Sequence, residues 1–376
     1  ATMSRVALPE LRRYGYSGGF STATLAAGGT LGILIPPSVI LVIYAILTEQ
    51  NIAKLFLAAF VPGILAAIGY MLTISIYVRL FPDAAGTRPP IPYAERFRAL
   101  ADVWPVLLVF GLVVGGIYLG WFTPTEGAAV GAFGTGLIAF ARGNLNWHVF
   151  VEAIYATALS TAMIFFIVLG AGLYNSFLAL TQVPQELANF VISLGLTPWA
   201  VLTLILIFYL VFGCLMDSLS MILLTIPIFF PVISAMDFGL VSLAAMQADA
   251  AREVLALGTP PGIAAEMLAS IEAAIAGGLE LTREQMAALD IRVTQGMANR
   301  LEAEYLAIWF GILVLIVVEV GLITPPVGMN LFIINAMDKE TPMSATYKAV
   351  MFFVGSDLVR VTILVLFPSI TLFVLY

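Results

Sequence analysis

Long apolar runs constrain this chain more than any other feature of its sequence. Residues 56–80, 104–121 and 349–375 carry few or no charges, and each run is long enough to cross a lipid bilayer. The chain is 61% hydrophobic and 10% charged, with a mean hydropathy of +1.04. Soluble domains are roughly 45–50% apolar and roughly 25% charged, so a water-soluble core cannot hold this much apolar surface. The sequence predicts an all-α polytopic membrane protein.

Composition also excludes several classes of function. The net charge of −7 and the lack of a basic patch argue against nucleic-acid binding. Single Cys (Cys214) and His (His148) residues rule out a disulfide within the chain and argue against a Cys/His metal site or a His-dependent hydrolase. No GxxxxGK[ST] motif occurs, so no P-loop is present. We expect a protein that is not an enzyme and has no organic cofactor.

Two short apolar arms, 199–212 and 221–235, flank the polar stretch GCLMDSLS. Each arm is shorter than the roughly 20 residues of a full crossing. We interpret 199–235 as a re-entrant hairpin whose polar tip lies at mid-depth, which is tolerated only inside protein or beside a wet cavity. Residues 236–304 differ from these apolar arms, because they contain ten acidic residues and four Arg in an Ala-rich background. They predict two or three short amphipathic helices outside the bilayer, separated by breaks at Gly258–Gly262 and Gly277-Gly278.

The remaining segments are predicted from apolar runs and from turn residues. They are a helix tail at 1–11, a broken helix at 20–47, a surface segment at 82–100, a return helix at 127–141, a long helix at 150–180 weakened at Gly170 and Gly172, an interfacial helix at 184–196, and a second broken helix at 305–336. The chain begins ATMSRVALPE without an initiator Met or a visible signal peptide. We therefore expect it to begin inside a larger protein.

Lys and Arg in short loops predict the orientation. We take the RRYGY loop to be cytoplasmic and the hairpin not to cross the membrane. Eleven basic residues then lie on the inner side, and Lys54 alone lies on the outer short loops. The other four Arg are in the long acidic segment. The eleven are Arg5, Arg12, Arg13, Arg79, Arg88, Arg96, Arg98, Arg142, Lys339, Lys348 and Arg360. This asymmetry predicts that 236–304 lies outside.

The two broken helices share the pattern G-[IL]-[LI]-x-P-P, at 32–37 and 321–326. A proline lacks the N–H that would bond the carbonyl four residues back, so the carbonyls of Gly32, Ile33, Gly321 and Leu322 lose their helical partners. An unsatisfied backbone group in hydrocarbon costs several kcal/mol. A bound cation would offset that cost; the alternative is a proline kink satisfied by water or by a Ser/Thr side chain. Matched interruptions in two halves are typical of secondary transporters built from repeats.

The predicted orientation makes the two repeats inverted, because the first broken helix rises outward and the second descends inward. The second broken helix follows a hairpin that enters from outside. By symmetry, residues 1–11 would be the exit arm of an earlier hairpin that enters from inside, with its tip upstream of residue 1.

Four stretches carry a resemblance to a known family: GTLGILIPPS, FTPTEGAAV at 122–130, GCLMDSLSMILLTIPIFFPV at 213–232 and GLITPPVGMNLF at 321–332. Together they resemble the large membrane subunit of tripartite ATP-independent periplasmic (TRAP) transporters, over nearly the whole chain except 236–304. The resemblance implies an inverted-repeat, elevator-type transporter with re-entrant hairpins and two broken helices in the bacterial inner membrane. It also implies sodium-driven uptake of organic acids, a small membrane subunit and a periplasmic substrate-binding protein.

The resemblance also implies a division of the chain. The segments are 1–48 (first repeat of the transport domain), 49–100 (scaffold helix and cytoplasmic surface segment), 101–196 (scaffold and connecting helices), 197–235 (second hairpin), 236–304 (periplasmic insert), 305–348 (second broken helix) and 349–376 (last span). In this family the second hairpin usually joins the second broken helix directly. The insert is either a docking or gating element or a decoration.

Site residues follow from the same motifs. The resemblance implies one sodium site at the backbone carbonyls around Gly32, Ile35 and Pro37, and a second around Gly321, Thr324 and Pro326, helped by Gly213 in the hairpin tip. Hydroxyls and amides that could bind substrate are Ser38, Ser218, Ser220 and Asn330; each could equally satisfy a freed backbone group. Asp217 could bind a cation or substrate, or could cap the return arm of the hairpin, and we favour capping. The mechanism implied is elevator-type alternating access against a scaffold built partly from 56–80 and 150–196.

Three other polar groups have simpler interpretations. Thr123 and Glu126 predict a helix cap, and Asp357 and Arg360, at i and i+3, predict an ion pair. Glu319 could pair with a basic group or sense a proton. The alternative function is a stand-alone sodium- or proton-coupled carboxylate symporter without a binding protein. The sequence does not identify the substrate; C4-dicarboxylates, sialic acids, sugar acids and other carboxylates are all alternatives.

Overall fold

The computed structural model describes residues 2–86, 92–258, 260, 263–338 and 340–375, without the side chains of residues 2, 3, 101 and 102. Within these ranges every regular element is helical. The chain divides into two compact units, residues 1–233 with 309–376 and residues 234–308. Arg88, Lys339, most of the Gly258–Gly262 break and part of the 82–100 segment lie outside the described residues.

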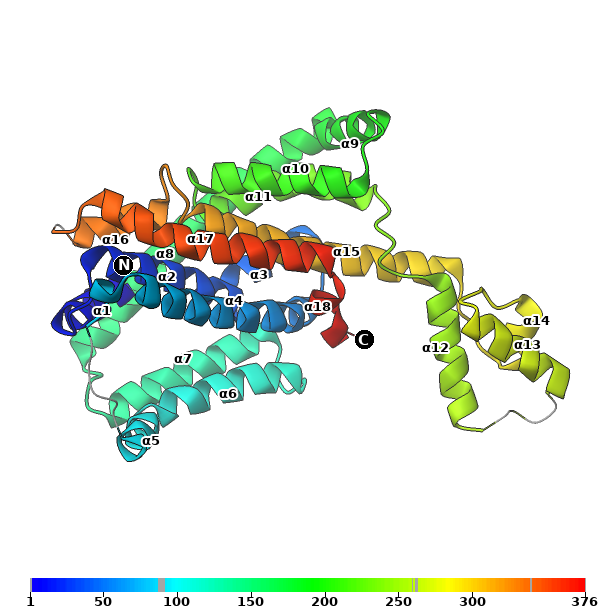
Figure 1. Cartoon of the computed structure of the whole chain (residues 1–376), viewed down its shortest axis with the longest axis horizontal. Helices are drawn as coiled ribbons and strands as arrows, with labels where there is room; N and C mark the ends of the chain where they lie inside the picture. Colours follow the sequence, from blue (N-terminus) through cyan, green and yellow to red (C-terminus); the bar gives the residue numbers. More distant parts are fainter. Residues whose placement is uncertain (1, 87–91, 259, 261–262, 339, 376) are drawn as a thin grey trace. The chain divides into compact units, whose positions relative to one another are not determined.

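The first unit contains most of the helices. They are α1 (Thr2–Arg13), α2 (Gly18–Leu34), α3 (Val39–Leu47), α4 (Ile52–Leu80), η1 (Pro82–Ala84), α5 (Tyr93–Asp102), α6 (Trp104–Tyr118), α7 (Pro124–Ala141), α8 (Trp147–Thr181), α9 (Val183–Ser193), α10 (Pro198–Gly213), α11 (Ser218–Ser234), the end of α15 (Gln295–Gly321), α16 (Met329–Met337), α17 (Met343–Leu366), α18 (Ser369–Leu372) and η2 (Phe373–Leu375) (Figure 1).

Four of these helices, α4, α8, α15 and α17, are long and apolar enough to cross a membrane, and six spans result if each bent helix pair counts as one. One bent pair is α2 with α3, at 46°. The prediction of an all-α polytopic membrane protein is confirmed. The predicted weakening of the long helix at Gly170 and Gly172 is not seen as a break, because α8 is continuous through both.

Both predicted broken helices are present. α2 ends at Leu34 and α3 begins at Val39, while α15 ends at Gly321 and α16 begins at Met329. Both Pro-Pro peptide bonds are cis. The second broken helix was expected to begin at residue 305, which is wrong: α15 begins at Gln295, because the polar stretch before the apolar run is itself helix-forming and continues into it.

The second hairpin is also present as a pair of antiparallel helices, α10 and α11, joined by residues 214–217 (Figure 1). Phe208 of α10 packs edge-on against Phe229 of α11, with ring centroids 5.0 Å apart. The Thr225 hydroxyl donates to the Tyr209 hydroxyl at 2.8 Å. Whether the hairpin re-enters a bilayer stays a prediction.

Helix α17 contacts both broken helices. It packs along α2 and α4 and against α16 (Figure 1). A buried hydrogen-bond chain crosses it: the hydroxyls of Thr22 and Thr346 lie 2.8 Å apart, and Thr346 donates to Asn335 Oδ1 at 3.0 Å. Gly19 of α2 is so close to α17 that a Cβ there would stand 2.8 Å from the Ala345 carbonyl. Arg12 of α1 pairs with Asp338, beyond α16.

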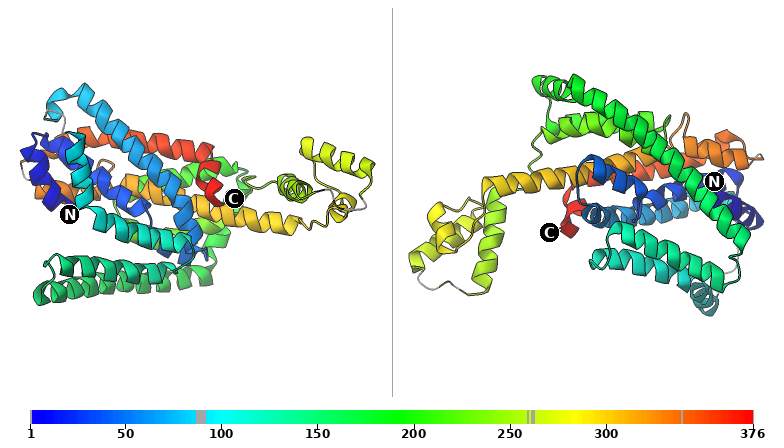
Figure 2. Two further views of the ribbon diagram at one scale, coloured as in Figure 1. Left: turned by 90° about the horizontal axis from the view of Figure 1, so that it is seen from below. Right: turned by 180° about the vertical axis from the view of Figure 1, so that it is seen from behind.

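Helix α4, which the predicted division places with the scaffold, packs against α2, α3 and α17, the helices around the two breaks. The helices α6 and α7 form a separate antiparallel pair (Figure 1 and the right-hand view of Figure 2). The turn before α7 carries the predicted cap: Thr123 Oγ1 accepts from the Glu126 N–H at 3.3 Å, and Glu126 Oε2 accepts from the Thr123 N–H at 2.8 Å. The capping interpretation is confirmed.

The second unit, residues 234–308, matches the predicted insert closely. Its helices are α12 (Leu243–Ala256), α13 (Ala265–Ala276), α14 (Arg283–Ala288) and the beginning of α15. α13 ends at the predicted break, where Gly278 has φ +63°. Ala251, Ile271, Leu281 and Leu289 form a small core of its own. The insert therefore folds around its own apolar residues.

One basic residue was placed wrongly in the orientation count. Arg360 lies inside α17, is 6% exposed and pairs with Asp357, so it is not a loop residue. Without it the predicted inner count is ten, since 11 − 1 = 10, against one. The predicted ion pair itself is confirmed, with Arg360 Nη2 2.8 Å from Asp357 Oδ1.

Candidate functional site

The second break is a compact turn between α15 and α16. The Thr324 N–H donates to the Gly321 carbonyl at 2.9 Å, and the Asn330 N–H donates to the Leu322 carbonyl at 3.1 Å. Gly328 has φ +59°, a left-handed backbone conformation that suits glycine, and it is the N-cap residue of α16. The two carbonyls that we expected to be bare therefore each accept one hydrogen bond. A carbonyl oxygen has two lone pairs, so each keeps one for a further ligand.

The tip of the hairpin touches this break through two glycines. A Cβ at Gly321 would stand 2.7 Å from Gly213 Cα, and a Cβ at Gly213 would stand 3.0 Å from the Val318 carbonyl oxygen. A Cβ contact of 2.7 Å is essentially never seen, so position 321 requires glycine, and a contact of 3.0 Å is tighter than most, so a Cβ at position 213 would force its neighbours to move. The structure thus brings Gly213, Gly321 and Thr324 together at the second break.

Two other groups bind the carbonyls of this turn or lie close to them. The Thr324 hydroxyl donates to the Val320 carbonyl at 2.6 Å, which leaves the lone pairs of its own oxygen available. The Tyr347 hydroxyl of α17 donates to the Pro326 carbonyl at 2.7 Å. Tyr347 was not foreseen from the sequence, because nothing in its position in α17 reveals a contact with Pro326, 21 residues earlier.

The polar residues of the tip have distinct roles. Asp217 Oδ2 accepts the Ser220 N–H at 2.9 Å, so Asp217 caps α11 as we favoured. Ser218 is buried, whereas Asp217 is exposed and Ser220 is half-buried. Ser218 therefore faces the protein interior, while the carboxylate of Asp217 faces outward.

Glu319 lies one turn before the break and is 1% exposed. Neither of its carboxylate oxygens has a hydrogen-bond partner among the described residues, although Ser218 of the tip is close enough to influence the carboxyl group. Glu319 is not among the site residues predicted from the sequence. Its position in an apolar span, just before the break, is the observation that points to it.

The first break is more open. Ser38 caps α3, since its hydroxyl accepts the Leu41 N–H at 3.5 Å, and the Ile35 N–H donates to the Leu31 carbonyl at 3.1 Å. Pro37 is exposed. A Cβ at Gly32 would meet no atom of the described chain within 4 Å, in contrast to Gly321. Gly32, Ile35, Pro37 and Ser38 therefore lie together at one break, but no hairpin tip covers Gly32 here.

The substrate candidates also divide between the two breaks. Ser218, Ser220 and Asn330 belong to the hairpin tip and to α16, beside the second break, whereas Ser38 belongs to the first. Asn330 is half-buried in the first turn of α16, and its backbone N–H bonds the Leu322 carbonyl. The chemistry available at the second break is a set of neutral oxygen atoms and one buried carboxyl group, which suits a hard cation.

Comparison with known proteins gives consistent results. Residues 1–370 match the family described as "Tripartite ATP-independent periplasmic transporter, DctM component". The C4-dicarboxylate TRAP transporter large permease protein DctM of Pseudomonas aeruginosa is 30% identical over 373 residues, covering 99% of this chain and 71% of that protein. The protein of the same name in Vibrio cholerae is 27% identical, covering 93% of this chain and 66% of that protein.

A sialic acid TRAP transporter large permease, SiaM of Vibrio cholerae, is 32% identical over 234 residues, or 62% of this chain and 54% of that protein. The chain therefore spans between about half and seven-tenths of the length of these curated relatives.

Proposed function

Because the chain belongs to the DctM family of tripartite ATP-independent periplasmic transporters, we propose that it carries out sodium-coupled secondary uptake of an organic acid anion. It does so as the transport subunit of a system that depends on a binding protein, in the bacterial inner membrane. The contact between Gly213 of the hairpin tip and Gly321 of the second break carries this proposal. It joins two segments that sequence motifs predicted to share one ion site.

Sodium binds at the second break. The ligands are the second lone pairs of the carbonyls around Gly321 and Pro326, together with the Thr324 hydroxyl oxygen. The freed carbonyls at the end of α15 lie at the negative end of the helix dipole, which also favours a cation. The carbonyls around Gly32, Ile35 and Pro37 supply the corresponding ligands at the first break.

Sodium then fixes the hairpin tip against the break. With the tip fixed, Ser218 and Ser220 and the amide of Asn330 offer neutral hydrogen bonds to an anion. The group of helices around both breaks moves as an elevator against a scaffold. The packing of α4 against α2, α3 and α17 supports including α4 in the moving group, with α6 to α9 as the scaffold.

The relatives guide the choice of substrates and partners. Two of them are named as C4-dicarboxylate permeases, one as a sialic acid permease and another as a fused isethionate permease DctMQ. We infer that C4-dicarboxylates are the first substrates to test, and that a small membrane subunit and a periplasmic binding protein assist. The ten-to-one distribution of basic residues supports a periplasmic location for 236–304, where a docking role would place it.

The test is uptake into proteoliposomes with an imposed sodium gradient, with and without candidate binding proteins. The critical variant replaces both Pro325 and Pro326 by Ala. The new N–H groups can then bond the Gly321 and Leu322 carbonyls, which removes the oxygens proposed for sodium. We expect sodium-dependent uptake to be lost while insertion and monodispersity are kept.

Pro184→Ala in the first turn of α9 is the control, since it replaces a proline in a helix of the proposed scaffold and not at either break. Its uptake should equal that of the unaltered protein. Uptake that needs sodium equally in the double variant would refute the assignment of the site. Uptake at full rate without any binding protein would favour the stand-alone symporter instead.

A further inference from the structure

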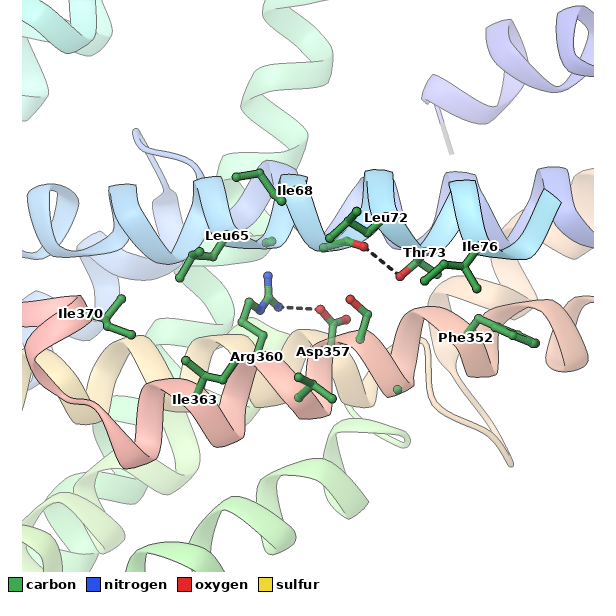
Figure 3. Close-up of a pocket in the computed structure, with 15 residues that line it drawn as sticks. Leu65, Ile68, Leu72, Thr73, Ile76, Phe352, Asp357, Arg360, Ile363 and Ile370 are labelled. Atoms are coloured by element: carbon green, nitrogen blue, oxygen red, sulfur yellow. Dashed lines mark hydrogen bonds and ion pairs between the residues drawn. The ribbon is translucent and has the colours of Figure 1, made fainter. Parts of the chain in front are cut away.

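A cavity of about 500 Å³ opens between α4 and α17, away from both breaks (Figure 3). Its lining is mostly apolar, and its polar members are Thr73, Ser356, Asp357 and Arg360. From α4 it includes Leu65, Ile68, Leu72 and Ile76, and from α17 it includes Phe352, Val359 and Ile363. Ile370 of α18 closes one end. No residue of the proposed transport site lines this cavity.

The rim of the cavity faces outward on two candidate membrane spans. Ile68, Leu72 and Val359 are 43%, 58% and 60% exposed. On helices that cross a bilayer, such side chains meet hydrocarbon rather than water. The cavity therefore opens toward the lipid phase, and whatever enters it laterally comes from the membrane.

One cationic side chain lies in this apolar lining. Arg360 is 6% exposed, and its Nη2 donates to Asp357 Oδ1 at 2.8 Å. Its Nε and Nη1 have no hydrogen-bond partner among the described residues. In Figure 3 the guanidinium extends from α17 toward α4, on the same side of α4 as Leu65. Leaving guanidinium donors unsatisfied in a low-dielectric site is costly, so these two nitrogens require acceptors.

The neighbouring groups do not supply those acceptors in the described structure. Asp357 Oδ1 accepts Arg360 Nη2, and its other oxygen, Oδ2, accepts the Tyr70 hydroxyl at 2.7 Å. The Tyr70 oxygen in turn lies 3.0 Å from the Thr30 hydroxyl, which also bonds the Ala27 carbonyl. All four side chains are buried, so the network holds the carboxylate in place. Arg360 thus keeps two fixed donors that point into a cavity open to lipid.

We propose that this cavity is a phospholipid site, in which an acyl chain lies along the aliphatic walls and phosphodiester or ester oxygens accept from Arg360. The chemistry matches on both sides: hydrocarbon against aliphatic side chains, and oxygen acceptors against guanidinium donors. Arg360 lies six residues before the end of α17, which is about 9 Å along the helix. A headgroup at the membrane interface reaches this depth with its ester region. A small, strongly hydrated dicarboxylate does not suit so apolar a lining.

The test uses a variant that fills the cavity and spares the ion pair. Gly355 of α17 lines the cavity, and a Cβ there would meet no atom within 4 Å, so Gly355→Leu enters open space. Gly115→Leu in α6 is the matched control, because Gly115 is also helical and equally open. Arg360→Met removes the donors as a second variant, though it also leaves Asp357 without its partner.

The measurement is native mass spectrometry of the full chain purified from membranes in mild detergent. We expect one phospholipid to stay bound to the unaltered protein and to Gly115→Leu, and retention to fall about tenfold or more in Gly355→Leu. Adding back dioleoyl phosphatidylglycerol should raise the melting temperature of the unaltered protein and not that of Gly355→Leu. Inorganic phosphate should have no effect.

Three results would overturn the proposal. Equal phospholipid retention in Gly355→Leu and Gly115→Leu would show that the lipid binds elsewhere. An equal stabilisation by oleate alone would assign the cavity to a fatty acid. Loss of a copurifying protein, rather than of a lipid, from Gly355→Leu would assign it to a protein partner.

Discussion

The contact between the hairpin tip and the second break can be tested by adding a single carbon atom. In Gly321→Ala the new Cβ would stand 2.7 Å from Gly213 Cα and 2.8 Å from the Gly213 carbonyl carbon. Non-bonded carbon atoms prefer about 3.5–4.0 Å, so the tip must retreat by roughly 1 Å. The neighbours are backbone atoms of a packed helix end, which cannot rotate away as a side chain could.

The energetic effect follows from this displacement. Overpacking of this kind costs about 1–3 kcal/mol. If the cost falls on the closed, sodium-bound arrangement, sodium affinity falls by about 5- to 150-fold. Gly213→Ala should act in the same direction but less strongly, because its Cβ would stand 3.0 Å from the Val318 carbonyl oxygen.

The assay is the sodium concentration that gives half-maximal uptake in proteoliposomes, measured at saturating substrate. Gly28→Ala in α2 is the control, since a Cβ there meets no described atom within 4 Å. We expect the half-maximal concentration to rise in Gly321→Ala and to stay constant in Gly28→Ala. The reasoning is refuted if Gly321→Ala inserts normally and shows the sodium dependence of the unaltered protein.

Two further substitutions test the packing of the first unit. Tyr70→Phe removes the hydrogen bond to the buried carboxylate of Asp357 and should lower the free energy of unfolding by about 1.5–3 kcal/mol. Thermal melting in detergent should show a clearly lower melting temperature. Tyr155→Phe, on the exposed face of α8, should leave the melting temperature unchanged. Thr123→Ala removes the cap of α7 and should cost about 0.5–2 kcal/mol, whereas Thr123→Ser should keep most of the stability. If Ser and Ala at that position were equally destabilising, the cap would not be the reason.

Local chemistry explains what the sequence predicted well. The Pro-Pro pairs dictate both breaks, because two consecutive prolines remove two adjacent helical hydrogen bonds, whereas single prolines such as Pro62 lie inside continuous helices. The cap at Thr123 and the pairing of Asp357 with Arg360 depend on residues three apart in one helix, so spacing alone predicts them. The helical hairpin follows from the lengths of its two arms.

Contacts between distant segments could not be predicted in the same way. Tyr70 lies 287 residues from Asp357, and no feature of α4 indicates which of its faces meets α17. The neighbours of α4 could not be predicted either. Its apolar run predicts a membrane span, but only the structure shows that it packs against α2, α3 and α17. The Gly213–Gly321 contact was expected only as help from the tip, since two glycines reveal no distance until the helices are placed.

The hydrogen-bond chain from Thr22 through Thr346 to Asn335 has a mechanical consequence. It connects α2, α17 and α16 through the buried hydroxyls of Thr22 and Thr346 and the half-buried amide of Asn335. Part of the first broken helix and part of the second are therefore held against the same helix, α17. If the helices around the breaks move as proposed, this link favours a joint displacement of the two interruptions, and ions bound at either one would shift together.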